Sequence, residues 1–119
     1  MGTDGLLGGR PHPRAYGSCP RILGHYSRDL GLLTLEEAVR KMTSLPAGIL
    51  HLSDRGVLQS GNAADVVVFN PQTIRECSSY EDPRQYPEGI PYVFVNGRPV
   101  LADGRSTGAR PGHLLQHHG

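Results

Sequence analysis

Hydrophobic residues recur at helical spacing in two stretches of the first half of the chain. In the first stretch, residues 20–31, the positions that share one helix face are Ile22, Leu23, Tyr26 and Leu30. Pro20 suits the first turn of such a helix, and Gly31 suits the left-handed position just past its end. The pattern therefore predicts an amphipathic helix between these two residues.

The second stretch, residues 34–45, begins with a capping box. In its opening sequence TLEE, the side chains of Thr34 and Glu37 can each bond the other residue's free backbone N–H. The hydrophobic stripe that follows comprises Leu35, Ala38, Val39, Met42 and Leu45. Such a stripe is typical of a core-facing helix, and the sequence SLP ends it, with a short turn through Leu50.

The spacing of hydrophobic residues becomes strand-like in the second half of the chain. Residues 56–59 predict a short strand, and the run ADVVVF at residues 64–69 predicts another. Both strands are followed by turn-forming residues, Ser-Gly-Asn after the first and Asn-Pro after the second.

A β-hairpin is predicted at Asn96-Gly97, the preferred residue pair for a type I′ turn. Residues 92–95 and 98–101 supply its two strands. Pro99 lies on the return strand, and proline has no N–H to give to a neighbouring strand. We therefore expect that strand at an edge of the sheet.

Loops are expected in residues 1–19 and 71–91, and the polar tail after Gly104 is expected to be frayed. Sixteen glycines and ten prolines among 119 residues, with no Trp, predict a loop-rich protein with one modest core. Two helices followed by a partial sheet are typical of the closing part of a larger fold, because a few short strands cover little core by themselves.

Composition excludes several classes of partner. The formal charge of +1 and the scattered basic residues argue against nucleic-acid binding. No apolar stretch approaches the roughly 20 residues of a membrane span, and no secretory signal pattern is found. Cys19 and Cys77 lack CxxC spacing and suit a reducing compartment. We expect a cytoplasmic protein with neither nucleic acid nor membrane as partner.

The opening sequence MGTDGLLGGRPHPRAYG is the first candidate site. Asp4 lies between glycines, which would let its carboxylate approach a metal-bound water and accept a proton. Arg14, held by nearby prolines, offers a two-pronged guanidinium suited to a substrate carboxylate, and His12 lies in the same loop. Spacing alone favours a simpler interpretation, an Asp-Gly turn followed by a basic loop.

The other candidate site residues, the histidines, Cys19 and Ser18, have weaker support in the sequence. The histidines are His12, His25, His51, His113, His117 and His118, and none has HxH, HExxH or Cys/His spacing. The adjacent pair at the end of the tail suits an exposed surface. Cys19 precedes the predicted helix, whose N-terminus would lower its pKa, but no activating His or Asp is placed beside it. Ser18 lacks a GxSxG context, so we expect neither residue to be a nucleophile.

Five motifs occur in a fixed order over residues 2–115: GTDG…HPRAYGSCPRILGHY, LTLEEAVRKMTSLPA, DRGVLQSGNAADVVVFNP, YEDPRQYPEGIPYVFVNGRPV and TGARPGHLL. In this order they resemble the C-terminal end of the N-acyl-D-amino-acid deacylases (D-aminoacylases), members of the metal-dependent amidohydrolase superfamily. GxxxxGxxADVVVF is shared by most amidohydrolases with a small β-domain. HPRAYG with PRxLG and EDPRQYPEGI is more specific to the deacylase branch.

The resemblance implies an α/β fold with three parts. Residues 1–55 would be the end of a TIM-like (β/α)8 barrel with its terminal helices, residues 56–104 strands of a small β-sandwich, and residues 105–119 a tail. Asp4 matches the family's Asp at the end of the eighth barrel strand, which adjoins or ligates zinc and acts as base toward the hydrolytic water. Arg14 matches the Arg associated with the substrate carboxylate, and His12 receives no defined role.

The family's remaining metal ligands, an HxH pair, a Cys and two further His, match nothing in this chain. Cys19 stands where relatives usually carry an aromatic residue, and Asn70 stands where Asp is commoner. We therefore expect a C-terminal fragment of a zinc-dependent enzyme that hydrolyses the amide bond of N-acyl-D-amino acids. The chain alone is expected to bind no zinc and to be inactive, and its expected partner is a complementary N-terminal barrel chain.

Two alternatives are not enzymes. The chain could serve as an interaction module or as one half of a split enzyme, in which case apolar faces would be exposed on residues 35–45 and 66–69. A small Gly/Pro-rich binding domain unrelated to hydrolases fits the composition, but it leaves the ordered motifs to coincidence.

Overall fold

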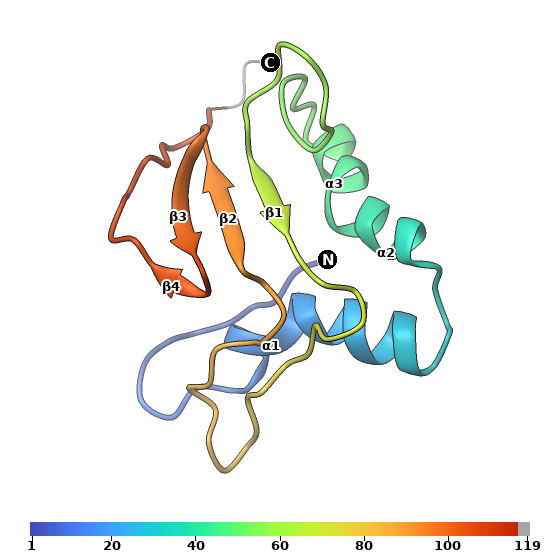
Figure 1. Ribbon diagram of the computed structural model, residues 1–119, viewed down its shortest axis with the longest axis vertical. Coiled ribbons are helices and arrows are strands. Elements are labelled where there is room, and N and C mark those ends of the chain that lie inside the picture. Colours follow the sequence, from blue (N-terminus) through green and yellow to red (C-terminus); the bar gives the residue numbers. More distant parts are fainter. Residues whose placement is uncertain (117–119) are drawn as a thin grey trace. The chain divides into compact units, whose positions relative to one another are not determined.

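The computed structural model describes residues 1–116 and divides into two compact units. The first unit consists of Met1–Val39 and Asn70–Gly89, and the second of Arg40–Phe69 and the chain from Ile90 onward. Each unit thus combines two segments that are distant in sequence (Figure 1). The predicted boundaries at residues 55 and 104 concern the architecture of a whole family enzyme and stay a prediction. The predicted exposed pair His117-His118 lies outside the described residues.

The first helix begins at Arg14, earlier than predicted. α1 (Arg14–Arg21) continues directly into η1 (Ile22–Asp29), a π-helix. The prediction that all of residues 1–19 form a loop is therefore wrong for residues 14–19.

Gly17 does not break this helix, although a glycine at such a position is typical of a helix breaker. In the structure Gly17 is buried inside α1. A methyl group at this position would lie 2.6 Å from Ser78 Oγ and 2.9 Å from Glu76 Cβ. The glycine is needed for the close approach of residues 76–78 to the helix, not for a turn.

Pro20 lies inside the helix rather than in its first turn. Because proline has no N–H, it cannot donate to the carbonyl four residues earlier, and the wider π-helical turns start at Ile22. At the other end, the Leu30 N–H bonds the His25 carbonyl, five residues earlier, at 2.9 Å. Gly31 follows with a φ of +62°, which confirms its predicted position past the helix end.

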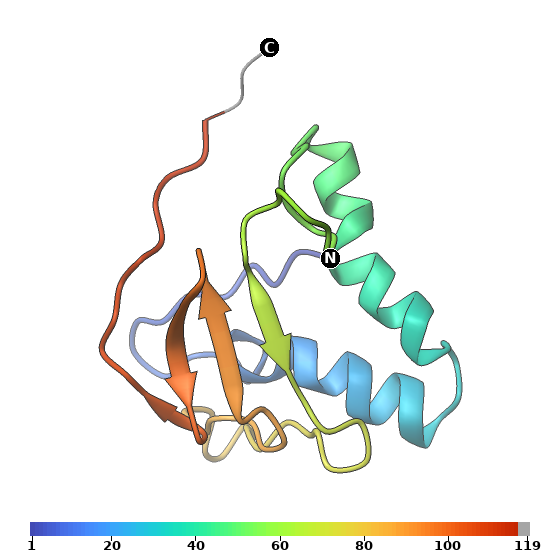
Figure 2. The ribbon, with the colours of Figure 1, turned by 45° about the horizontal axis from the view of Figure 1, so that its top comes forward.

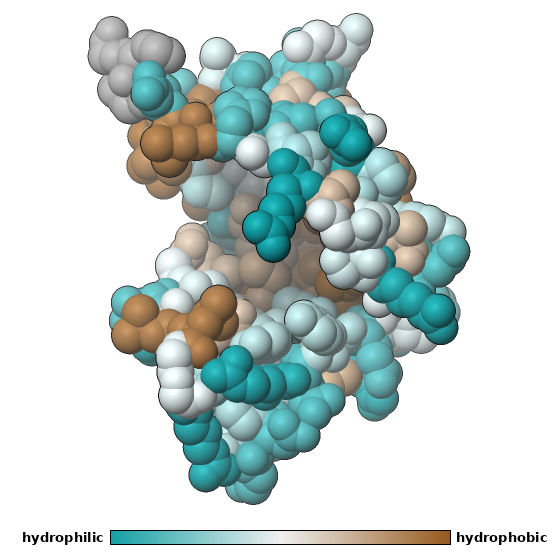
Figure 3. Space-filling model, turned by 90° about the vertical axis from the view of Figure 1, so that its left-hand side faces the viewer, coloured by the Kyte–Doolittle hydropathy of each residue, from teal (hydrophilic) through white to brown (hydrophobic). Residues whose placement is uncertain are grey.

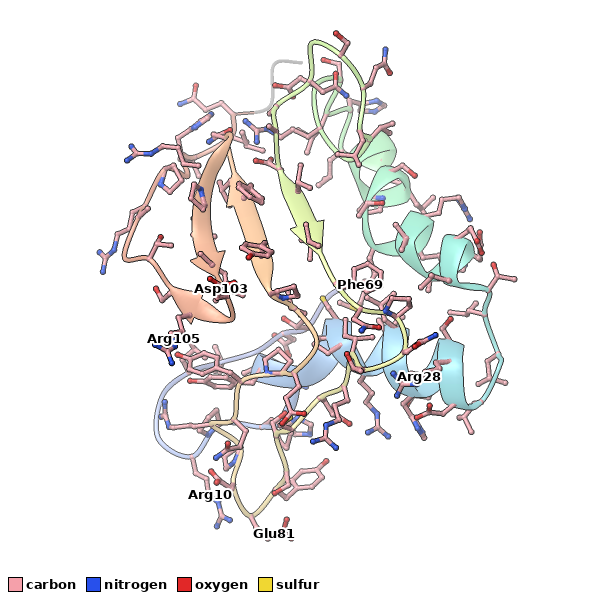
Figure 4. All side chains as sticks on the ribbon, in the orientation of Figure 1. Arg10, Arg28, Phe69, Glu81, Asp103 and Arg105 are labelled. Atoms are coloured by element: carbon pink, nitrogen blue, oxygen red, sulfur yellow. The ribbon has the colours of Figure 1, made fainter. Side chains whose placement is uncertain are left out.

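The core of the first unit forms where residues 70–89 fold against η1. Ile74, at 1% exposure, is its most deeply buried large side chain. Arg28 of η1, labelled in Figure 4, donates from Nη1 to the Ile74 carbonyl at 2.7 Å. The segment closes through an isolated antiparallel bridge between Arg75 and Glu88. This loop therefore has a fixed path although it contains no regular strand.

α2 (Leu35–Met42) starts at the predicted cap. Thr34 Oγ accepts the Glu37 backbone N–H at 3.2 Å, which confirms the Thr34 half of the capping box. A separate short helix, α3 (Ser44–Ile49), follows directly. The single helix predicted through Leu45 is therefore two helices.

A four-stranded antiparallel sheet forms in the second unit, in the order β1-β2-β3-β4. Its strands are β1 (Val66–Val68), β2 (Tyr92–Val95), β3 (Arg98–Ala102) and β4 (Arg105–Ser106), side by side in Figure 1 and Figure 2. Asn96 and Gly97 have φ values of +48° and +74°. The predicted type I′ hairpin is confirmed.

The prediction of a frayed tail after Gly104 is wrong for Arg105 and Ser106, which form β4. Asp103 and Gly104 have φ values of +49° and +73°, and they join β3 to β4 as a second tight hairpin. Asp-Gly also favours the type I′ turn, so this hairpin has a local signal in the sequence. Pro99 consequently lies on an internal strand, and the edge prediction is wrong. β4 pairs only with Leu101 and Ala102, away from the proline.

Residues 56–59 form no strand, contrary to the prediction. Gly56 has a φ of +83°, and a methyl group there would lie 2.6 Å from the Ala47 Cβ of α3. The segment is a turn packed against that helix. Four residues of mixed polarity are too few to separate a strand from an extended loop.

Candidate functional site

Asp4 lies in the irregular segment that precedes α1. Its backbone has a φ of +48°, in the left-handed region, and its carboxylate is 92% exposed. Arg14 Nη2 donates to the Asp4 carbonyl at 2.7 Å and lies 3.3 Å from the carboxylate Oδ2. The structure thus brings together the two residues that the sequence analysis proposed as base and carboxylate anchor.

The start of α1 fixes where the Arg14 side chain begins. Pro11 and Pro13 are buried, and the Pro13 carbonyl accepts the backbone N–H groups of Tyr16 and Gly17, each at 3.0 Å. Arg14 is the first residue of the helix. Its guanidinium reaches back along the loop, where Nη2 bonds both the carbonyl and the carboxylate of Asp4, and the Nε and Nη1 donors remain for a ligand.

His12 is fully integrated into the same loop. Its Nδ1 accepts the Arg14 backbone N–H at 3.0 Å, and its Nε2 lies 2.9 Å from Tyr80 Oη. The two rings meet edge to face, with centroids 5.0 Å apart. The sequence motifs provide no role for His12, and Tyr80 is not among the predicted site residues.

Residues 78–84 hold the loop of residues 7–13 through main-chain carbonyls. Arg10 Nη2 donates to the carbonyls of Tyr80, at 2.7 Å, and Glu81, at 3.0 Å; Arg10 and Glu81 are labelled in Figure 4. In the opposite direction, Arg84 Nη2 donates hydrogen bonds to the carbonyls of Leu7 and Gly9, at 3.0 and 2.7 Å. Arginine is suited to this task because its planar fork can bond two carbonyls at once.

A second set of contacts ties residues 76–78 to the helix. Ser78, which is buried, donates from Oγ to the Pro13 carbonyl at 3.1 Å. Arg21 forms an ion pair with Glu76, and its guanidinium lies 5.4 Å from the Tyr26 ring centroid. The hydrogen bond with Tyr26 and then the one with Glu76 raise the pKa of Arg21, so its guanidinium stays charged. Contacts between residues 55 to 77 positions apart leave no periodic signal that sequence reasoning could have used.

Cys19 is not an activated nucleophile. It lies within α1 rather than at a helix N-terminus, and desolvation of the thiol raises its pKa. The expected lowering of its pKa is therefore wrong, although the conclusion against a nucleophile stands. Ser18 donates its hydroxyl to the Arg14 carbonyl at 2.8 Å, a local helix bond.

Within residues 1–116, no group of three or more His, Cys, Asp or Glu side chains is arranged to hold a metal ion. Among the same residues, no helix is long and apolar enough to cross a membrane.

Comparison with known proteins identifies the family. The model of the amidohydrolase family matches residues 1–101. The chain belongs to the amidohydrolase family. Among curated relatives of this amidohydrolase, the D-aminoacylase of Alcaligenes xylosoxydans xylosoxydans is 49% identical over 116 residues, which cover 97% of the chain and 24% of the relative. The N-acyl-D-glutamate deacylase of the same organism is 45% identical over 98% of the chain and 24% of the relative.

Solved structures agree with these relatives. One of them is a crystal structure of D-aminoacylase, described as defining a novel subset of amidohydrolases, with a TM-score of 0.88 and 50% identity. That match covers 91% of this chain and 23% of the D-aminoacylase chain. The N-acyl-D-glutamate deacylase of Bordetella bronchiseptica, complexed with zinc and a phosphonate mimic of the tetrahedral intermediate, has a TM-score of 0.82 and 48% identity. That match covers 88% of the chain and 23% of the deacylase.

The resemblance and fold class predicted from the motifs are confirmed by these matches. The chain is an amidohydrolase segment with helices and an antiparallel sheet, and its structure matches a part of D-aminoacylase. It spans about a quarter of the length of the curated relatives. The roles predicted for Asp4 and Arg14 stay predictions.

Proposed function

We propose that this chain forms part of a zinc-dependent amidohydrolase that hydrolyses the amide bond of N-acyl-D-amino acids. The observation that carries the proposal is the pairing of Asp4 with Arg14 in a chain about half identical to D-aminoacylase. Further support comes from the metal dependence of the relatives: one solved D-aminoacylase is described by its binuclear metal centre, and the Bordetella deacylase holds zinc.

Arg14 would bind the carboxylate of the substrate. With Nη2 engaged by Asp4, Nε and Nη1 remain to donate a charge-assisted hydrogen bond to a substrate carboxylate. The side chain is 43% exposed, so a ligand can reach it. Every N-acyl amino acid carries such a carboxylate one carbon from the amide nitrogen, so this contact would set the distance between Arg14 and the bond that breaks.

Asp4 would accept a proton at a carboxylate oxygen when water attacks the amide carbonyl, and would pass it to the leaving amine. The water oxygen forms the new C–O bond, the C–N bond breaks, and the two water protons end on the amine and on the acid group. Arg14 bonds the main-chain carbonyl and the Oδ2 atom of Asp4, which leaves the other carboxylate oxygen, Oδ1, open for the reaction. A positioned acid–base group of this kind typically contributes about 10²- to 10⁴-fold in rate.

Zinc, when bound, supplies Lewis-acid polarisation of the carbonyl and lowers the pKa of a water. The described residues fit this group only in part: the exposed Asp4 carboxylate offers one oxygen ligand, and residues 1–116 hold no set of three. We infer that the other ligands come from residues outside this chain, and that the chain by itself binds zinc weakly and is inactive.

A fusion tests the proposal. In the fused deacylase, this chain replaces the 116 aligned residues of the Alcaligenes D-aminoacylase. Zinc-loaded fused deacylase and the chain alone are assayed on N-acetyl derivatives of D-leucine, D-glutamate and D-aspartate. We expect turnover of at least one substrate by the fused deacylase and none by the chain alone. A soluble, zinc-loaded fusion without turnover would contradict the proposal.

A second candidate function is that of an interaction module or one half of a split enzyme. Exposed apolar side chains favour it: Leu58, Ile49 and Val67 are 77%, 68% and 54% exposed. Figure 3 shows hydrophobic residues at the surface of the face that it draws. Size-exclusion chromatography of the chain separates the two candidates, because a compact monomer that also fails to restore activity to a barrel fragment argues against a docking role.

We also propose a cytoplasmic location. Cys19 and Cys77 are free thiols, which is typical of a reducing compartment. Fractionation of cells that produce the tagged protein tests this, since recovery in an extracellular or periplasmic fraction would contradict it.

A further inference from the structure

A chain of hydrogen bonds connects residue 80 to the candidate site, and the proposed chemistry does not use it. Tyr80 Oη lies 2.9 Å from His12 Nε2, and His12 Nδ1 accepts the Arg14 backbone N–H at 3.0 Å. Arg14 in turn donates to the Asp4 carbonyl at 2.7 Å. The path runs from Tyr80, which lies 68 residues after His12, to the proposed base, and all four residues belong to the first unit.

The Arg14 N–H determines where the imidazole carries its proton. A backbone N–H can only donate, so His12 Nδ1 must present a lone pair, and the neutral ring then carries its hydrogen on Nε2. Nε2–H therefore donates to Tyr80 Oη. The tyrosine hydroxyl stabilises the one neutral tautomer in which His12 can hold the Arg14 amide.

The backbone around Tyr80 is fixed independently of this hydroxyl. Arg10 bonds the carbonyls of Tyr80 and Glu81, and Ser78 Oγ donates to the Pro13 carbonyl at 3.1 Å. Removal of the hydroxyl alone should therefore leave the loop in place. The edge-to-face contact with His12 also survives in phenylalanine.

We propose that Tyr80 is a positioning residue for Arg14. Its hydroxyl accepts from Nε2–H and so stabilises the His12 tautomer that the Arg14 N–H requires, His12 Nδ1 holds the first N–H of α1, and the Arg14 guanidinium is thereby kept beside Asp4. This inference rests on the proposed function of Arg14 as the substrate's carboxylate anchor. It extends that function to two residues for which neither motif spacing nor the resemblance provides a role.

NMR spectroscopy of the 119-residue chain tests the hydrogen-bond path. Long-range ¹H–¹⁵N spectra report the His12 tautomer, and amide exchange reports the Arg14 N–H. We expect the Nε2–H tautomer in the wild type. Tyr80→Phe should give a mixture of tautomers and roughly 3- to 10-fold faster exchange at Arg14, the change expected for loss of one hydrogen bond.

Tyr86→Phe is the matched control. Its ring contacts Tyr16, and its hydroxyl has no hydrogen-bond partner among residues 1–116, so we expect wild-type spectra. A second variant, His12→Asn, offers its amide oxygen in place of Nδ1 and has no tautomers. In that background, Tyr80→Phe should change Arg14 exchange no more than Tyr86→Phe does. A wild-type Nδ1–H tautomer, or identical spectra for Tyr80→Phe and Tyr86→Phe, would overturn the proposal.

The fused deacylase adds a kinetic readout. Tyr80→Phe should raise KM about 3- to 10-fold with little change in kcat, because the anchor loses position while the base remains. Equal KM values for Tyr80→Phe and Tyr86→Phe in an active fusion would also overturn the positioning role. Absence of all turnover would count against the proposed function instead, and the NMR result would still decide the role of Tyr80.

Discussion

Arg14 holds Asp4 by its main chain more closely than by its carboxylate: Nη2 lies 2.7 Å from the Asp4 carbonyl and 3.3 Å from Oδ2. A contact to the carbonyl fixes the Asp4 backbone, whose φ of +48° is uncommon for residues other than glycine. The carboxylate, 92% exposed, keeps its second oxygen open for chemistry. One arginine can thus hold the proposed base and still offer donors to a ligand.

Replacement of Arg14 should affect both binding and rate. In the fused deacylase, Arg14→Ala removes the carboxylate anchor, and truncation of a charged hydrogen-bonded pair costs about 2–4 kcal/mol, or roughly 30- to 1,000-fold in KM. Because Asp4 also loses its carbonyl partner, kcat should fall as well. Steady-state kinetics with an N-acetyl-D-amino acid measure both.

Two variants make the Arg14 result specific. Arg14→Lys keeps the charge and one donor to Asp4, so its kcat should fall less than that of Arg14→Ala. Arg105→Ala removes an exposed arginine on β4, labelled in Figure 4, and should behave as the wild type. Equal losses for Arg14→Ala and Arg105→Ala would show that only overall charge matters.

Gly17→Ala should destabilise the chain although alanine is the better helix former. Alanine gains about 1 kcal/mol in helix propensity, but its methyl group would lie 2.9 Å from Glu76 Cβ, an atom close to the backbone that cannot swing away. Overpacking of this kind costs about 1–3 kcal/mol. Urea unfolding followed by circular dichroism should show a lower midpoint.

Gly48 in α3 provides the matched control for Gly17. Nothing lies within 4 Å of a methyl group placed there, so Gly48→Ala should raise the unfolding free energy by about 0.5–1 kcal/mol. If Gly17→Ala is as stable as Gly48→Ala, residues 76–78 do not pack against α1 as described.

Local contacts could be predicted from the sequence, whereas contacts between distant segments could not. Thr34 and the Asn96-Gly97 turn were predictable because their bonds are local: one cap to a backbone N–H three residues away, and one turn between adjacent strands. Gly17 was misjudged because its reason for being glycine lies about 60 residues later. The contacts of the candidate site divide in the same way, into local ones that a motif can suggest and distant ones that it cannot.

Asp4 and Arg14 lie ten residues apart, and a motif could suggest that they act together. The contact between His12 and Tyr80 spans 68 residues within two irregular loops, and no periodicity reports it. β4 was missed for a different reason. Its Asp103-Gly104 turn is a local signal of the same kind as Asn96-Gly97, but the polar residues around it suggested a tail.

Asp65 should contribute to acid stability in the second unit. Its carboxylate accepts the Asn96 backbone N–H at 2.8 Å and pairs with Arg55, and these contacts, the backbone bond first, lower its pKa. Because the folded pKa lies below the ordinary value of about 3.9, the stabilisation is present above that value and is lost as the pH falls through the folded pKa.

Asp65→Asn should therefore flatten the decline of the unfolding free energy below about pH 4, and should lower stability at pH 7. Chemical denaturation at pH 7 and pH 3 measures the difference. Asp54→Asn is the control, since that carboxylate is 61% exposed and lies 3.8 Å from Arg55 Nε. A wild-type pH profile in Asp65→Asn would contradict the assignment.

The central claim is that Asp4 supplies the acid–base group of a deacylase, and the kcat of Asp4→Asn in the fused deacylase tests it most directly. Asparagine keeps the size of the side chain and the backbone carbonyl that Arg14 binds, so KM should change little, and the zinc content of the variant is brought to that of its parent before the assay. We predict that kcat on the preferred N-acetyl-D-amino acid falls by about 10²- to 10⁴-fold. A zinc-loaded Asp4→Asn fusion with the kcat of its parent would contradict the claim.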